Sequence, residues 1–381
     1  MNDMIFCANV ASMSYMLFAI LYLMTFFGFG KKTHLGIDIG TASIKIVELE
    51  VNGGRPELKN YGIFQLESAD EAVNVAQDGS QSKVAHFSDD DIVAAIKDLI
   101  KRMGSKSTEV AMAIQSFSTF STIISMPYLS EDEIDKAIPY EARKYVPLPL
   151  ESVVLDWSIA SVNKGGAGQE PSVEVFLVAV PKTETKRYQE IAQKAGLQLK
   201  VLELENSALI RALVGNDLSP FAIVNIGGRS TSILIVDGGV ERVSHNYEVG
   251  GFEITKAIAS SLKVSLRRAE ELKRSFGVQQ VDNNVINSVM SSLLNMMVFE
   301  TKKTIHSYEE QRKRKIAQVF LVGGMSNMPK FVDYFSEKLG MAVAVGNPLA
   351  RVGLPKEVEP LSFEINTKCA VALGLAMRDW K

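Results

Sequence analysis

The chain has 381 residues, which is enough for two or three domains with large cores. Hydrophobic residues make up 46% and charged residues 22%, a composition that excludes a disordered chain, a collagen-like repeat and a small disulfide scaffold. The net charge of −3 gives no positive field for nucleic acid, and the two cysteines lack the spacing of a zinc site or a disulfide framework.

Residues 1–30 form a hydrophobic segment whose residues 5–30 carry no charge, long enough for a transmembrane helix. Lys31 and Lys32 follow it directly, so the positive-inside rule puts the rest of the chain in the cytoplasm. No basic region precedes the segment, which disfavours a cleaved signal peptide. Translation from Met24 is the alternative, and it would leave the earlier residues outside the functional protein.

The first chemical motif lies in HLGIDIGTASIKIVELE, which spans His34 to Glu50. Two β-rich runs flank a polar bend, which we call the first glycine turn (Gly40, Thr41, Ala42, Ser43). The sequence therefore predicts a hairpin with a glycine-containing bend at its tip.

The same pattern returns in FAIVNIGGRSTSILIVDGG, which spans Phe221 to Gly239. Its bend is the second glycine turn (Gly227, Gly228, Arg229, Ser230), and one constant offset relates it to the first. The same offset aligns Asp38 with Asn225. A repeat this far apart predicts two similar lobes, because solenoid repeats have much shorter periods.

Such turns are suited to anion binding. Glycine lets the backbone come close to a ligand, and successive N–H groups can cradle phosphate oxygens. A single turn is more simply a tight hairpin, but two matched turns predict a clamp on one polyphosphate.

A third glycine turn (Gly323, Gly324) follows the expected strand Val319–Val322. Ser326 or Asn327 is expected to cap a helix that starts near Pro329, because a serine or asparagine cap and a proline in the first turn favour helix initiation. A strand, a glycine pair and a helix start form a nucleotide-contact geometry in many α/β folds.

In this order the three motifs resemble the phosphate-1, phosphate-2 and adenosine motifs of the actin-like ATPase superfamily. Val175 to Leu213 resembles the segment that contains the first connecting helix, and Ala370 to Met377 resembles the second, with Gly374 at the helix crossing. By the same resemblance Glu270 and Lys273, in RAEELKR, contact the adenosine.

Residues 125–157 are similar to the type IV pilus assembly proteins of the PilM family. The residues that carry this likeness are Pro127, Glu141, Ala142, Tyr145, Pro147, Pro149, Asp156 and Trp157. The resemblance implies an α/β, two-lobed actin-like ATPase with duplicated ribonuclease-H-like lobes at 31–215 and 216–381. It also implies an SHS2-type interaction subdomain inserted at about 118–172.

The resemblance implies an ATP and Mg²⁺ site in the cleft between the lobes. Asp38 would hold the metal through water, and Glu205 would hold its water shell or the attacking water. Lys45 would reach a phosphate as a point charge. The first turn, with Gly227, Gly228 and Ser230, would bind phosphates, and Gly323, Gly324 and Ser326 would border the adenosine.

Two of these assignments have simpler alternatives. Asp38 could merely cap its own turn, and Lys45 could be a solvent-facing residue on a half-buried strand. A departure from the family pattern also matters, because the second turn usually follows an aspartate and here follows Asn225. The missing charge predicts slow or negligible ATP hydrolysis, since phosphoryl transfer depends on such charges.

Two features of the helical regions are expected to be structural. Val285, Val289, Leu293, Met296 and Met297 fit one helix face, which we expect in the core. The basic residues 312–315 are expected at a helix C-terminus, where they complement the helix dipole.

The resemblance implies an ATP-binding adaptor of the pilus assembly platform on the cytoplasmic face of the inner membrane, with residues 5–30 as a candidate anchor. Its implied partners are the N-terminus of a PilN-like membrane protein, other platform or motor proteins, and a second copy of the chain. Alternatives are an FtsA-like division protein that polymerises at the membrane and a sugar-type kinase. The ending Arg378-Asp379-Trp380-Lys381 lacks the amphipathic helix typical of FtsA. A role in a type II secretion machine is a further alternative.

Overall fold

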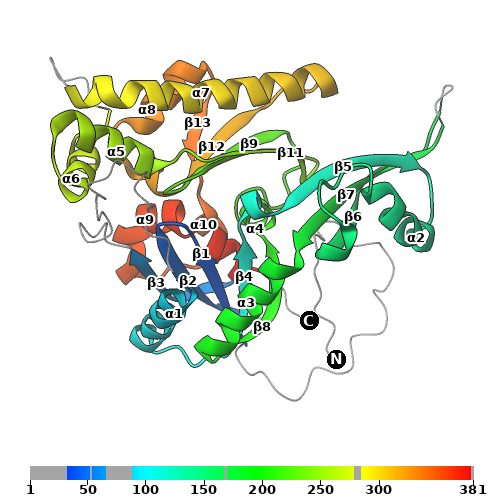
Figure 1. Ribbon diagram of the computed structural model, residues 1–381, viewed down its shortest axis with the longest axis horizontal. Helices are drawn as coiled ribbons and strands as arrows, with labels where there is room; N and C mark the ends of the chain where they lie inside the picture. The colour runs from blue at the N-terminus through cyan, green and yellow to red at the C-terminus, as the bar shows by residue number, and fades with distance from the viewer. Residues whose placement is uncertain (1–31, 52–53, 66–87, 167–169, 279–284, 379–381) are drawn as a thin grey trace, which may run out of the picture.

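The computed structural model describes residues 32–51, 54–65, 88–166, 170–278 and 285–378. Two lobes are stacked one above the other in Figure 1, and a smaller unit projects from one side. The hydrophobic segment at residues 1–30 lies outside the described residues. Within the described ranges, no helix combines the length and the apolar character that crossing a bilayer requires.

The first lobe is built on a five-stranded mixed sheet with the order β3-β2-β1-β4-β8. β1 and β2 pair antiparallel, as do β2 and β3, whereas β4 is parallel to both β1 and β8. The strands are β1 (Lys32–Ile39), β2 (Ser43–Val51), β3 (Glu57–Gln65), β4 (Glu109–Ile114) and β8 (Gln198–Leu204).

The second lobe repeats this sheet with the order β11-β10-β9-β12-β13. Its first three strands are again antiparallel, and β12 is again parallel to both of its neighbours. The strands are β9 (Phe221–Ile226), β10 (Thr231–Asp237), β11 (Val240–Tyr247), β12 (Gln318–Val322) and β13 (Val343–Val345). The matched order and direction confirm the internal repeat that the two glycine turns predicted.

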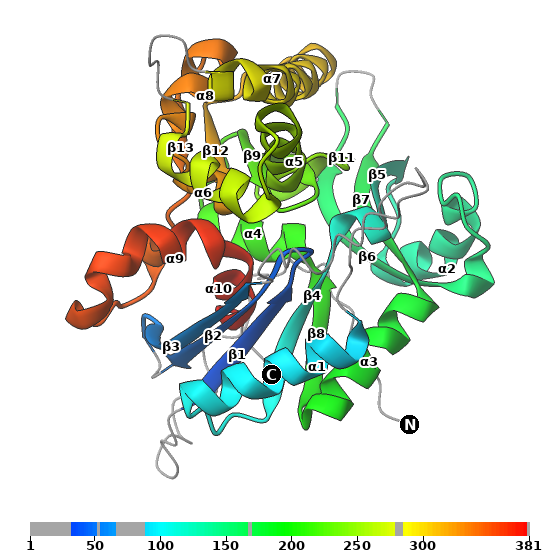
Figure 2. The ribbon, with the colours of Figure 1, turned by 60° about the vertical axis from the view of Figure 1, so that its left-hand side comes forward.

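Helices cover the outer face of each sheet. In the first lobe these are α1 (Asp89–Met103) and α3 (Lys182–Ala195). Ser88 begins α1 with a reciprocal capping box to Asp91, which satisfies two donors of the first turn. Figure 2 shows α1 and α3 side by side below the first sheet.

In the second lobe the covering helices are α5 (Gly251–Leu262), α6 (Leu266–Phe276), α7 (Val285–Arg312) and α8 (Phe331–Leu339). The expected core face of α7 was wrong by about one position. Met297 is buried, but Val289 and Leu293 are only partly so. The buried row is Ile286, Met290, Leu294, Met297, Thr301, Ile305 and Tyr308. The helix does end at Arg312, as the basic residues at 312–315 predicted.

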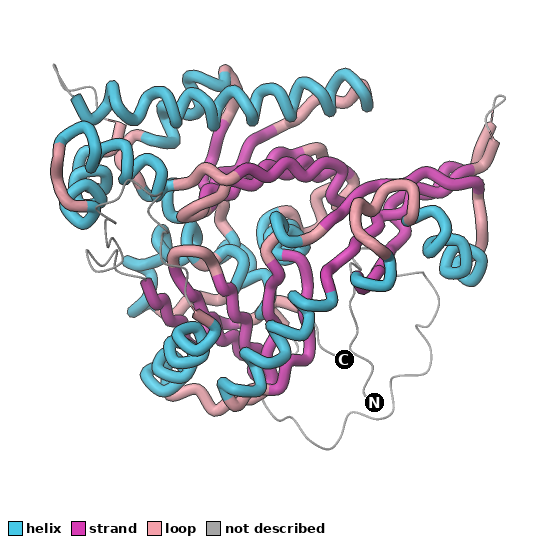
Figure 3. The backbone as a smooth tube through the Cα atoms, in the orientation of Figure 1, coloured by secondary structure: helices cyan, strands magenta, loops and turns pink. Residues whose placement is uncertain are grey.

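A third sheet, with the order β5-β7-β6, forms the projecting unit. It consists of β5 (Phe120–Pro127), β6 (Val153–Asn163) and β7 (Ser172–Pro181), with α2 (Glu131–Ala142) packed against it. Its own core includes Ile124, Ile134, Ile138 and Val175. We call these elements the third-sheet unit. Its last strand, β7, ends at Pro181, so the unit extends beyond residue 172, where the sequence placed the end of the inserted subdomain. Figure 3 shows its strands reaching away from both lobes.

A separate core joins the two lobes. It contains residues of α4 (Glu205–Leu213) and α10 (Ala370–Ala376) together with strands of both sheets, among them Ala113, Ile223 and Leu234. The two helices cross closely, because a Cβ on Gly374 would lie 2.0 Å from the carbonyl oxygen of Ala208. This position confirms the expectation that Gly374 lies at the helix crossing. A short helix, α9 (Ser362–Lys368), precedes α10.

Candidate functional site

The first glycine turn joins β1 to β2, and the N–H of Gly40 donates to the carbonyl of Ser43 at 3.0 Å. Asp38 and Lys45 are direct cross-strand partners, and the Lys45 Nζ lies 3.0 Å from the Asp38 Oδ2. The Lys45 side chain is only 15% exposed, so the solvent-facing alternative for it is wrong. A Cβ on Gly40 would lie 2.8 Å from the Lys45 Nζ, so glycine leaves the space that this ammonium occupies.

The second glycine turn has the same hydrogen bond, from the N–H of Gly227 to the carbonyl of Ser230 at 2.9 Å. The two turns lie directly against each other. A Cβ on Gly228 would lie 2.5 Å from the Cβ of Ala42 and 3.5 Å from the Thr41 hydroxyl. The structure therefore brings together two turns that are almost two hundred residues apart, as the sequence predicted.

A further glycine pair (Gly250, Gly251), which the sequence motifs did not include, supports the second turn. The N–H groups of Gly251 and Phe252 donate to the carbonyls of Gly227 and Gly228, at 3.0 and 2.7 Å. A Cβ on Gly250 would lie 2.7 Å from the same carbonyls, so this position needs glycine for close approach. The available signal was a Gly-Gly doublet immediately before a helix, the same signal that identified the third turn.

The predicted adenosine residues lie beside this pair. The Lys273 Nζ is 2.6 Å from the Glu270 Oε2, and it donates to the Gly251 carbonyl at 2.9 Å and to the Thr255 hydroxyl at 2.8 Å. Burial alone would raise the pKa of Glu270, but the Lys273 ammonium holds it below its ordinary value. Thr255 belongs to this cluster and was not singled out by the sequence.

The third glycine turn completes the border of the site. Gly323 has a φ of +90°, and a Cβ there would lie 2.2 Å from the carbonyl of Ile226 at the end of β9. Met325 follows Gly324, and its Sδ would lie 3.2 Å from a Cβ on Gly251. The third turn therefore contacts both β9 and the start of α5.

The predicted cap at Ser326 or Asn327 was wrong. Residues Gly324–Asn327 form a short 3₁₀ helix, and α8 begins only at Phe331, with Lys330 at its N-cap position. The Ser326 hydroxyl is buried and has no hydrogen-bond partner among the described residues. The 3₁₀ helix occupies the residues that the capping pattern had assigned to the start of α8.

Glu205 is the first residue of α4 and follows β8 directly. Burial and the nearby Asp38 carboxylate raise the pKa of Glu205 to about 7, although hydrogen bonds from Ser116 oppose the shift. Burial also raises the pKa of Cys369, whose thiol lies near Lys45 and Asp38, to about 12. Asp38 and Glu205 thus share one electrostatic environment.

The residues around Asp38 would suit a magnesium–nucleotide complex better than a bare metal ion. Within the described ranges, no three His, Cys, Asp or Glu side chains gather to hold a metal ion. Mg²⁺ commonly uses one or two carboxylates, several waters and substrate phosphates, so Asp38 beside two glycine turns that are predicted to bind phosphate would match its needs. The individual ligand roles of the site residues stay predictions.

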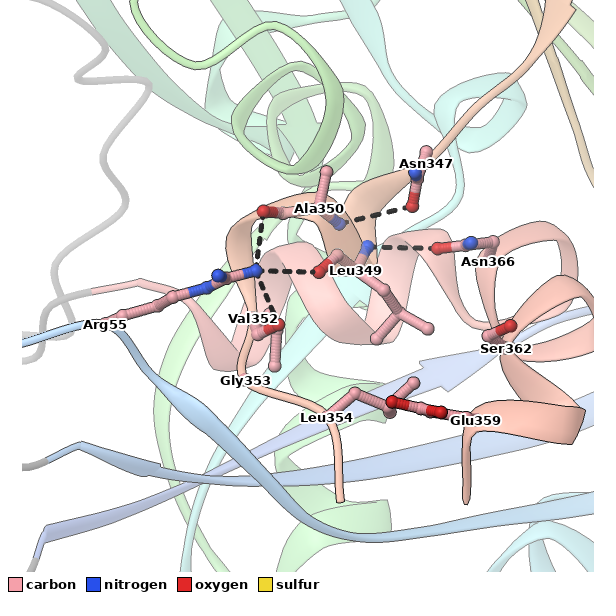
Figure 4. Close-up of a pocket in the computed structure, with 10 residues that line it drawn as sticks. All are labelled: Arg55, Asn347, Leu349, Ala350, Val352, Gly353, Leu354, Glu359, Ser362 and Asn366. Atoms are coloured by element: carbon pink, nitrogen blue, oxygen red, sulfur yellow. Dashed lines mark hydrogen bonds between the residues drawn. The ribbon is translucent and has the colours of Figure 1, made fainter. Parts of the chain in front are cut away.

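A separate pocket of about 370 Å³ lies at the outer edge of the first sheet. Arg55 reaches across it and donates to the carbonyls of Leu349, Ala350 and Val352 (Figure 4). None of the predicted site residues lines this pocket. The guanidinium is engaged with main-chain carbonyls, so we attribute to Arg55 a structural role at this edge.

Comparison with known proteins agrees with this architecture. The family model described as type IV pilus assembly protein PilM matches residues 36–380. A solved PilM-PilN type IV pilus biogenesis complex is similar at a TM-score of 0.75 and 25% identity, over 91% of this chain and 98% of that chain. The ethanolamine utilization protein EutJ of Carboxydothermus hydrogenoformans shares the fold, with a TM-score of 0.53 and 18% identity over 91% and 90%.

Curated relatives include cell division proteins. FtsA of Neisseria meningitidis serogroup B is 23% identical over 282 residues, which are 65% of this chain and 66% of that protein. FtsA of Enterococcus hirae is 21% identical over 348 residues, 83% of this chain and 78% of that protein. Together these likenesses confirm an actin-like α/β fold with two mixed sheets.

Proposed function

Because the chain belongs to the family of the type IV pilus assembly protein PilM, we propose that it is an ATP-binding adaptor of the pilus assembly platform. In this role MgATP binds between the lobes and sets the angle between them. The third-sheet unit binds the cytoplasmic N-terminus of a PilN-like membrane protein. The observation that carries the proposal is the meeting of Gly228 with Thr41 and Ala42. Two phosphate-cradling turns from separate lobes face one another there.

Calorimetry with ATP and magnesium tests the nucleotide site. We expect binding heat with the wild type, and at least tenfold weaker binding with Gly228→Ala, since the new methyl group would collide with Ala42. Gly54→Ala is the matched control, because nothing lies within 4 Å of a Cβ there. Absence of heat with the wild-type protein would overturn the proposed nucleotide site.

The proposed peptide site rests on the relative and on exposed aromatic side chains. The similar solved structure is a complex of PilM with PilN. In this chain Tyr128, Tyr140, Tyr145 and Leu148 lie before, within and after α2, and all four are exposed. An extended peptide could contact these side chains and pair with an edge strand of the third sheet. A pull-down with a PilN-like N-terminal peptide tests this, and loss of binding in Tyr140→Ala is the expected result.

We propose slow ATP hydrolysis because Asn225 stands where the superfamily commonly has aspartate. It is a strand residue next to the second turn, opposite Ser232 in the sheet register. Asn225→Asp restores a carboxylate close to the phosphates and should raise the turnover number at least tenfold, measured by phosphate release. An unchanged rate would contradict this explanation of slow turnover.

The remaining proposals concern location and the two alternatives. We propose the cytoplasmic face of the inner membrane, tested by fractionation with a tag placed before Met24. A sugar-type kinase would transfer the γ-phosphate to sugars, and an FtsA-like protein would sediment as polymers with membranes. We expect neither activity from the purified protein.

A further inference from the structure

A chain of buried hydrogen bonds runs from the third-sheet unit to the cleft. Its central member is Glu241 on β11, which is only 5% exposed. Each of its carboxyl oxygens accepts one bond. Oε1 accepts from the Ser121 hydroxyl on β5 at 2.8 Å, and Oε2 accepts from the Asn206 amide on α4 at 2.8 Å. One carboxylate of the second lobe thus touches both the third-sheet unit and the helix that joins the lobes.

Glu241 also fixes the orientation of Asn206. Burial raises the pKa of Glu241, and the hydrogen bonds from Ser121 and Asn206 oppose the shift. In its ionised form the carboxyl group only accepts hydrogen bonds, so the amide nitrogen of Asn206 faces it. The same nitrogen lies 3.2 Å from the Ser244 hydroxyl. The amide oxygen therefore points the other way, where it accepts from the Ser116 hydroxyl at 2.7 Å. Asn206 has no exposed surface, so water cannot replace either contact easily.

Ser116 ends this chain beside Glu205. Its main-chain N–H and its hydroxyl both act to lower the pKa of the Glu205 carboxyl. A serine hydroxyl has a single proton, so Asn206 and Glu205 compete for it. The orientation of Asn206 thereby decides how strongly Ser116 holds Glu205.

We infer that Ser121, Glu241, Asn206 and Ser116 form a relay of positioning residues that links peptide binding on the third-sheet unit to the geometry of Glu205 in the nucleotide cleft. This inference rests on the proposed function. A shift of β5 on peptide binding changes the bond from Ser121 to Glu241, and the effect passes through Asn206 and Ser116. Buried networks of this kind have discrete arrangements, which suits them to transmit such a change.

The structure offers a matched control that joins the same two units without reaching Glu205. On β7, Glu174 forms ion pairs with Arg242 at 2.7 Å and with Arg312 at 2.6 Å. Loss of Arg312 therefore loosens the contact between the third-sheet unit and the second lobe but leaves the relay intact.

Calorimetry in a double-ligand design tests the inference on the full chain. The affinity for MgATP is measured with and without a saturating PilN-like peptide, and the ratio of the two dissociation constants is the coupling factor. We expect a factor of at least about fivefold in the wild type and in Arg312→Gln. In Glu241→Gln it should fall to within about twofold of unity, because the new amide can donate to Asn206 and allows it to flip.

Ser121→Ala removes the hydrogen bond at the other end of the relay, so this variant should also lose the coupling. It provides the test if Glu241→Gln does not fold. Coupling that persists in both variants would overturn the inference, as would its equal loss in Arg312→Gln. A wild type that binds both ligands with no coupling also overturns it. A wild type that binds neither ligand instead overturns the proposed function.

Discussion

At the scale of single residues, the site depends on charged side chains that are buried or nearly buried. Asp38 is 7% exposed and forms its ion pair with Lys45 across the hairpin. Lys45 also acts on Glu205, but burial and the Asp38 charge outweigh it and favour the protonated form of Glu205. A pKa of about 7 suits a group that must hold or release a proton near neutral pH.

The raised pKa of Glu205 predicts a pH-dependent cost to stability. Its ordinary value is 4.5, so the native state binds a proton that the unfolded chain has lost between pH 4.5 and about 7. Stability from this group is complete below 4.5 and disappears as the pH rises through about 7. Glu205→Gln removes that titration. Relative to wild type, its free energy of unfolding should rise by about 2 kcal/mol between pH 5 and pH 8.

Urea denaturation at both pH values, without nucleotide and with a chelator, provides the measurement. The exposed Glu131→Gln serves as the control for the loss of one surface carboxylate. A constant difference from wild type for Glu205→Gln would mean that Glu205 titrates normally in the folded protein.

At the scale of secondary-structure elements, the joint between the lobes depends on close backbone packing around α10. On one side a Cβ on Gly36 of β1 would lie 2.3 Å from the carbonyl of Ala372. On the other side a Cβ on Gly374 would lie 2.0 Å from the carbonyl of Ala208 on α4. α10 therefore lies tightly between the first sheet and α4, with glycine at both contacts.

Gly374→Ala should destabilise the protein although alanine is the better helix former. Helix propensity favours alanine by about 1 kcal/mol, but the added methyl group meets a backbone oxygen that cannot move aside. Overpacking of this kind costs about 1–3 kcal/mol or more, so we expect a net loss of about 2 kcal/mol. Thermal unfolding measures it, with Gly54→Ala as the tolerated control. A stability equal to wild type would show that α4 and α10 separate without cost.

At the scale of the whole molecule, two lobes of the same topology share one core through α4 and α10, and the third-sheet unit bridges them. Ser121 and Glu174 of this unit bind the β11 edge of the second lobe, although its strands are inserted in the chain of the first. A movement of one lobe relative to the other must therefore change the contacts of the third-sheet unit.

Binding of MgATP should consequently stabilise both lobes together. At a ligand concentration one hundred times the dissociation constant, the gain is about 2.7 kcal/mol. We expect a single unfolding transition that shifts upward by a few degrees in scanning calorimetry, and a smaller shift when a chelator removes Mg²⁺. A shift confined to one of two separate transitions would show that the nucleotide contacts only one lobe.

Much of the site could be predicted because its signals are local. A bend of glycine and small polar residues between two β-rich runs determines a hairpin, and Asp38 and Lys45 become partners once that hairpin forms. The repeat of the pattern determined the duplicated sheet. Local signals failed where two structures competed for the same residues, as at Ser326, where the 3₁₀ turn displaced the predicted helix cap.

The amino-acid sequence alone thus determined the two lobes and their glycine turns. Only the tertiary structure decided that Gly228 faces Ala42, that Gly250 supports the second turn, and that Glu241 joins Ser121 to Asn206. Hairpins and turns follow from neighbouring residues, whose spacing is visible in the sequence. Contacts between distant segments depend on how α4 and α10 pack between the sheets, and no short pattern encodes that packing.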